Sequence, residues 1–223
     1  PRILKEIASY GFGADCVSGN EILLALECGF TPDKILFAGV GKTDKEIQIG
    51  LDNDISCFNA ESIPELEVID QIAGEKGKKA RVALRINPNV DARTHKYITT
   101  GLDENKFGIN EQDLPKTLEK IKECTHLELI GMHFHIGSQI TDLSSFEALC
   151  VKAKQLQEWF IERGVSLPIL NVGGGLGINY HHPNHFPVTD FESYFRLFEK
   201  HLMPTDGQVL YFELGRSVVA PSG

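Results

Sequence analysis

Short apolar runs alternate with amphipathic stretches along the whole chain, and this alternation constrains the fold more than any other feature. The apolar runs are typical of buried strands, and the stretches between them have the spacing of helices that bury one face. A strand, a helix and a further strand form the repeating unit of a parallel sheet. The sequence therefore predicts a single α/β domain over residues 1–223.

The predicted elements begin with a helix rather than a strand. Helices are expected at 3–10, 20–28, 43–50, 62–74, 111–122, 142–163 and 189–202, and strands at 14–17, 34–38, 56–59, 81–86, 127–135, 169–172 and 209–213. Polar stretches at 89–110 and 181–188 interrupt them. A closed (β/α)8 barrel has one strand more than this. We therefore expect an incomplete barrel that lacks its first strand, with an open doubly wound sheet as the alternative.

Composition excludes some classes of function. The net charge of −9 argues against nucleic acid as the main partner, because phosphates are neutralised by clustered Lys and Arg. No apolar run approaches the ~20 residues of a membrane-spanning helix, so no membrane segment is expected. The five cysteines are odd in number and form no C-x-x-C pair, which favours reduced thiols in a cytoplasmic protein.

Polar residues gather where the predicted strands end, and a barrel carries its function at the carboxyl ends of its strands. A purely structural barrel would not need charged groups at so many of these places. The strand-end residues are Asp15, Ser18, Gly39, Asn59, Glu61, Arg85, Asn87, His133, His135, Gly173 to Gly175, Glu213 and Arg216.

Two strand-end segments are suited to an anionic ligand. The run GGGLG at 173–177 lets backbone N–H groups turn toward a phosphate, with a flexible turn as the alternative. It is not a dinucleotide fingerprint, because Ile178 stands where the last glycine would be needed. In ELGR at 213–216, Glu213 and Arg216 form an ion pair, or the carboxylate keeps a ligand's ring nitrogen protonated while the arginine grips an anion.

Two further segments have competing interpretations. His133 and His135 in HFHIGSQ are expected to point inward, either as metal ligands or with one ring stacked on an aromatic ligand and the other a hydrogen-bonded interior histidine. A metal site needs more ligands, and the loop histidines His181, His182 and His185 look solvent-exposed. The run GVGKT at 39–43 resembles a P-loop but has Leu36 where a glycine is required, so Thr43 is expected to cap the next helix.

Together these segments resemble the barrel domain of diaminopimelate decarboxylases, pyridoxal-phosphate enzymes with an alanine-racemase-like barrel. The resemblance extends over essentially the whole chain. It rests on GADCVSGNE, GVGKTDKEI, FNAES, LRINPNVDARTHKYITTGLDENKFGI, GMHFHIGSQITD, NVGGGLGINY and ELGRSVVA.

The resemblance implies a role for each matching residue. His135 would stack on the cofactor ring, and Ser138 with Gly173, Gly174 and Gly175 would hold the phosphate. Glu213 would face the pyridine nitrogen. Arg216 would contact the phosphate and a substrate carboxylate. The remaining implied cofactor contacts are Leu214, Gly215 and, near the phenolic oxygen, Arg85.

The implied reaction is decarboxylation of meso-2,6-diaminopimelate to L-lysine by a homodimer. Related decarboxylases acting on arginine, ornithine or carboxynorspermidine, a non-catalytic regulator and a metal-dependent hydrolase are the alternatives. The family's Schiff-base lysine would precede Pro1, and its β-domain would follow Gly223. Neither Lys42 nor Lys106 is at the lysine's position. We therefore expect no catalytic residue in this chain, which alone would be inactive. Leu214 replaces the family's usual proline.

Overall fold

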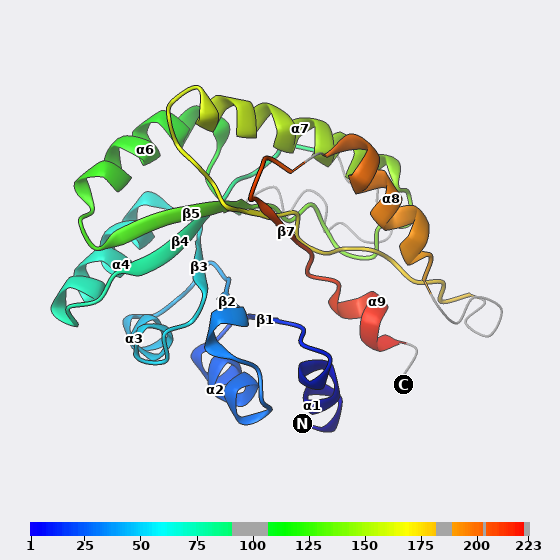
Figure 1. The fold of residues 1–223 in the computed structure, drawn as a ribbon, viewed down its shortest axis with the longest axis horizontal. Helices are drawn as coiled ribbons and strands as arrows, with labels where there is room; N and C mark the ends of the chain where they lie inside the picture. Colours follow the sequence, from blue (N-terminus) through cyan, green and yellow to red (C-terminus); the bar gives the residue numbers. More distant parts are fainter. Residues whose placement is uncertain (91–106, 182–188, 203, 221–223) are drawn as a thin grey trace. The chain divides into compact units, whose positions relative to one another are not determined.

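The computed structural model describes residues 1–90, 107–181, 189–202 and 204–220. The chain divides into two compact units. The first comprises Pro1–Arg85 with Gly108–Ile130, and the second comprises Ile86–Phe107 with Gly131–Gly223. The strands form one sheet in the order β1-β2-β3-β4-β5-β6-β7 (Figure 1). A doubly wound sheet would reverse its order part-way, so this sequential order excludes that alternative.

The first unit is built from parallel strands joined by helices. Its strand pairs β1–β2, β2–β3 and β3–β4 are all parallel, and neighbouring helices contact one another, α2 with α3 and α3 with α4 (Figure 1). Its elements are α1 (Arg2–Ser9), β1 (Ala14–Cys16), α2 (Gly19–Glu27), η1 (Pro32–Lys34), β2 (Ile35–Phe37), α3 (Asp44–Asp52), β3 (Cys57–Ala60), α4 (Ile63–Glu75), β4 (Ala80–Arg85), η2 (Glu111–Asp113), α6 (Leu114–Glu123) and the start of β5 (Leu127–His133).

Local sequence accounts for the ends of the helices in this unit. Thr43 accepts a hydrogen bond from the backbone of Glu46, whose side chain accepts one from the backbone of Thr43, so the predicted capping box is confirmed. Gly29 follows α2 with φ of 96°, a conformation that favours glycine. The first unit also buries β2, β3 and most of β4, as expected for strands of a parallel sheet.

The second unit contains the end of β5, α7 (Ser144–Ile161), β6 (Ile169–Asn171), α8 (Phe191–His201), β7 (Val209–Tyr211) and α9 (Gly215–Val219). In Figure 1, α8 lies beyond the end of α7, and the two helices contact each other. An aromatic cluster joins these elements: the Tyr194 ring of α8 lies 5.0 Å from Phe146 of α7 and 5.8 Å from Phe212 after β7. This aromatic core holds the carboxyl end of β7, and Glu213 follows directly after Phe212.

The structure corrects several predicted boundaries. Strand β5 ends at His133, two residues before its predicted end. The short elements η1 and α9 were not predicted. The remaining helices and strands agree with the prediction within a few residues. Most of the two polar stretches, 91–106 and 182–188, lies outside the described residues.

Candidate functional site

Three neighbouring strands of the second unit bring His133, Asn171 and Glu213 together. His133 and Asn171 are the last residues of β5 and β6 and are direct register partners. Asn171 is in turn the partner of Tyr211 on β7, and Glu213 follows two residues later. The Asn171 Nδ2 donates to Glu213 Oε1 at 2.7 Å, and the His133 Nε2 lies 3.3 Å from both carboxylate oxygens.

The carboxylate of Glu213 is nearly buried, with 10% of its side chain exposed. Burial raises the pKa of Glu213, but His133 and the hydrogen bonds from His133 and Asn171 outweigh it, so the net shift of the pKa is downward. His135, which is half-buried, also lowers this pKa. Glu213 therefore stays ionised and offers a negative charge to a ligand.

Glycines directly after β6 form the second part of the site. A Cβ on Gly173 would lie 2.1 Å from the Phe134 carbonyl oxygen, and one on Gly174 would lie 2.0 Å from that of Glu213. Gly175 has φ of 98°. Close backbone approach thus requires glycine here. Within the described residues, the N–H groups of Gly174 and Gly175 donate to no acceptor, and Gly174 is buried, so both remain available to an anion.

Arg216 forms the third part of the site. Its guanidinium donates to the Tyr180 hydroxyl and, at 3.2 Å, to the Ser138 hydroxyl. Both partners are neutral, and over the described ranges no carboxylate pairs with Arg216. Of the two alternatives for these residues, the ion pair between Glu213 and Arg216 does not form: Glu213 faces His133 and Asn171 instead. The guanidinium keeps its full positive charge for a ligand anion.

The residues present fit a ligand with a cationic ring and an anionic tail. Glu213 supplies a buried negative charge, while Gly174, Gly175 and Arg216 supply uncompensated donors. Of the two residues between Glu213 and Arg216, Leu214 is half-buried and Gly215 is exposed. Sequence reasoning missed the contribution of Asn171 and Tyr180. A polar residue ending an apolar strand is the signal that could have revealed Asn171.

Arg85, the remaining predicted contact, belongs to the first unit. Its guanidinium pairs with Glu61 Oε1 at 2.8 Å, and Glu61 also accepts from the Gly39 backbone. Lys42 of the same unit is buried, with its ammonium 2.7 Å from Glu65 Oε1 and hydrogen-bonded to the carbonyls of Gly39 and Asn59. The role of Arg85 toward a cofactor stays a prediction.

The histidines that the structure describes do not form a recognisable metal centre. Across the described ranges, no group of three or more His, Cys, Asp or Glu side chains is placed to hold a metal ion. His181 is exposed, as predicted, whereas His182, His185 and Lys106 lie outside the described residues. All five cysteines are free and buried. None of the described helices is long and apolar enough to cross a membrane.

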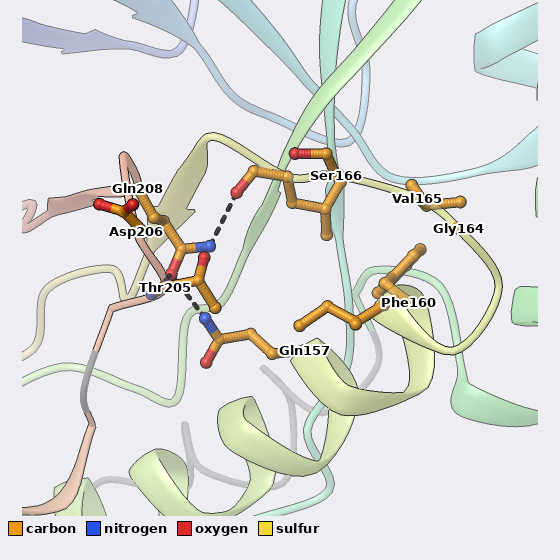
Figure 2. Close-up of a pocket in the computed structure, with 10 residues that line it drawn as sticks. Gln157, Phe160, Gly164, Val165, Ser166, Thr205, Asp206 and Gln208 are labelled. Atoms are coloured by element: carbon orange, nitrogen blue, oxygen red, sulfur yellow. Dashed lines mark hydrogen bonds between the residues drawn. The ribbon is translucent and has the colours of Figure 1, made fainter.

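A surface pocket of about 330 Å³ lies elsewhere in the second unit (Figure 2). Its lining residues 164–167 and 205–208 precede β6 and β7, so it lies at the amino ends of these strands. The Gln157 side chain donates to Gln208 across it. Because function in this type of fold lies at the carboxyl ends, this pocket is not the candidate site.

Comparison with known proteins shows which family the chain resembles. Residues 1–220 match the family model described as the pyridoxal-binding domain of pyridoxal-dependent decarboxylases. The chain is 52% identical over its full length to the diaminopimelate decarboxylase of Bacteroides thetaiotaomicron, covering 58% of it. It is 45% identical, over 81% of its own length, to that of Aquifex aeolicus, covering 43% of it.

A solved structure extends the likeness to the fold. The crystal structure of Helicobacter pylori diaminopimelate decarboxylase complexed with L-lysine matches 97% of this chain and 54% of that chain, with 41% identity and a TM-score of 0.87. The predicted incomplete α/β barrel of the alanine-racemase-like type is thereby confirmed. The chain spans about half the length of these relatives. By the match over residues 1–220, it belongs to the pyridoxal-dependent decarboxylase family, with pyridoxal phosphate as the implied cofactor.

Proposed function

We propose that the full-length protein decarboxylates meso-2,6-diaminopimelate to L-lysine with pyridoxal phosphate. The relatives at 41–52% identity are diaminopimelate decarboxylases, and one of them was solved with L-lysine. The observation that carries the proposal is the buried Glu213 carboxylate, which accepts a hydrogen bond from Asn171 and contacts His133. Residues 1–223 constitute the cofactor-binding barrel domain in this proposal.

The chain's own residues would divide the binding of the cofactor between them. The free N–H groups of Gly174 and Gly175, with the Ser138 hydroxyl and Arg216, would hold the phosphate. His135 would lie against the ring. Arg216 would also contact a substrate carboxylate, and Arg85 the phenolic oxygen. These roles follow the family's pattern at the matching positions.

Glu213 would perform the chemical task assigned to this chain. Its carboxylate would accept a hydrogen bond from the ring nitrogen and so hold a proton at that atom. When bound, the cofactor's protonated ring delocalises the electron pair left by departing carbon dioxide. Because Glu213 is ionised and nearly buried, its charge acts in a medium that screens it less than water does.

The assembly and location of the protein follow as further parts of the proposal. Five free cysteines support a reducing compartment such as the cytoplasm. A homodimer is proposed from the family resemblance alone, and light scattering of the purified protein would test it. A dimer that persists at low micromolar concentration is expected, and a monomer would contradict this part.

Activity assays on the full-length protein would test the reaction. We expect carbon dioxide and L-lysine to form from meso-diaminopimelate, with much less turnover of arginine or ornithine. The Glu213→Gln variant should still bind the cofactor but lose activity by about 100-fold or more, the order expected for one preorganised electrostatic group. Higher activity on arginine or ornithine than on meso-diaminopimelate would contradict the proposed substrate. Failure to bind pyridoxal phosphate would contradict the whole proposal.

A further inference from the structure

Glu213 is held by side chains from β5 and β6, and the proposed function does not specify what these two residues do. His133 on β5 and Asn171 on β6 are each 1% exposed. Asn171 is fixed in one orientation, because its Oδ1 accepts from the Gly173 backbone at 2.9 Å while its Nδ2 donates to Glu213. Two buried contacts therefore determine where this carboxylate points.

The surroundings of His133 indicate which ring nitrogen carries its proton. The Nε2 faces Glu213, whereas the Nδ1 is buried without a partner in the described part of the chain. The geometry thus places a proton on Nε2, from which His133 donates to the Glu213 carboxylate.

The other ionisable groups near Glu213 do not replace this donor. His135 lies beyond the end of β5 and is half-buried. The Tyr194 hydroxyl of α8 is buried without a partner in the described ranges, and burial, more than the nearby Cys150 and Glu213, raises the pKa of Tyr194. Arg216 is directed to the hydroxyls of Ser138 and Tyr180. His133 is thus an ionisable residue in direct contact with the carboxylate.

We propose that His133 is a positioning residue that, with Asn171, keeps Glu213 aimed and ionised, so that the ring nitrogen of the bound cofactor stays protonated. This inference rests on the proposed function, since it assumes that Glu213 faces that nitrogen. It differs from a packing role, because an apolar side chain of similar size would fill the same space without donating. It also differs from a metal-ligand role, which would leave the imidazole nitrogen directed at a metal rather than at Glu213.

Nitrogen-15 NMR of the full-length protein, loaded with pyridoxal phosphate labelled at the ring nitrogen, would test the inference. The resonance reports the protonation of that nitrogen during a pH titration. We expect His133→Phe to lower the midpoint pH of the ring nitrogen's titration by at least about one pH unit, a tenfold change in its protonation equilibrium. His133→Gln retains an N–H donor and should restore most of the shift. If His133→Phe does not fold, His133→Met serves the same purpose.

The matched control is His201→Gln, which removes another histidine–glutamate contact of the second unit, 3.2 Å from Glu147. It should leave the midpoint unchanged. If the titration midpoint of His133→Phe equalled that of His201→Gln, the inference would be overturned. If Glu213→Gln also left the midpoint unchanged, the proposed role of Glu213 would fail with it. If Glu213→Gln lowered the midpoint and His133→Phe did not, only the role of His133 would be wrong.

Discussion

Replacing Asn171 by leucine should destabilise the protein strongly although the two side chains have similar volumes. The variant loses a hydrogen bond to the Glu213 carboxylate, worth about 1.5–3 kcal/mol, and leaves the buried Gly173 N–H without an acceptor, at about 1–3 kcal/mol. The sum is about 2.5–6 kcal/mol. At roughly 2–4 °C per kcal/mol for a domain of this size, the melting temperature should fall by about 5–24 °C.

Differential scanning calorimetry of the cofactor-free full-length protein would measure this loss. The matched control is Asn53→Leu, because Asn53 makes a single side-chain hydrogen bond, to Ile49 at 2.9 Å, near the end of α3. This control should lose no more than about 1 kcal/mol. If the melting temperature of Asn171→Leu lay within about 2 °C of that of Asn53→Leu, the two buried hydrogen bonds of Asn171 would contribute less to stability than the values given above.

Three other substitutions test separate contacts. Gly174→Ala should weaken pyridoxal phosphate binding at least about tenfold and lower the melting temperature, because the added Cβ would lie 2.0 Å from the Glu213 carbonyl oxygen. In the control Gly41→Ala the added Cβ meets no atom within 4 Å, so neither binding nor melting temperature should change. Lys42→Met should cost about 3–5 kcal/mol in urea unfolding, since it leaves Glu65 buried and unpaired, and Lys42→Met with Glu65→Leu should recover most of it. The lowered pKa of Glu213 means that its stabilisation is present above about pH 4.5 and is lost as the pH falls through its folded-state pKa. The melting-temperature difference between the wild type and Glu213→Gln should therefore shrink with acidification below pH 4.5, and a constant difference would contradict this.

The order of helices and strands was predictable because it depends on local patterns. Thr43 and Glu46, for example, specify the start of α3 by themselves. The end of β5 was not predictable. Its apolar alternation continues through Phe134 and Ile136, but the chain leaves the strand after His133. The helix α9 has only five residues, too few to show a helical period.

The site was predictable only in part, because its contacts depend on register between strands. Sequence reasoning singled out Glu213, Ser138 and Arg216, and the structure brings the last two together. It did not connect His133 with Glu213, 80 positions apart, nor give a role to Asn171. Their proximity follows from the pairing of β5, β6 and β7, which no single segment encodes. The cofactor roles of the individual residues stay predictions.

One amide group joins the carboxylate of Glu213 to the backbone of Gly173, so these two groups cannot drift apart independently. The distance between the basic nitrogen and the acidic tail of a bound molecule must therefore match the distance between Glu213 and the glycine backbone, which Asn171 sets. The site would thus select its coenzyme by size, before any bond in a substrate is broken.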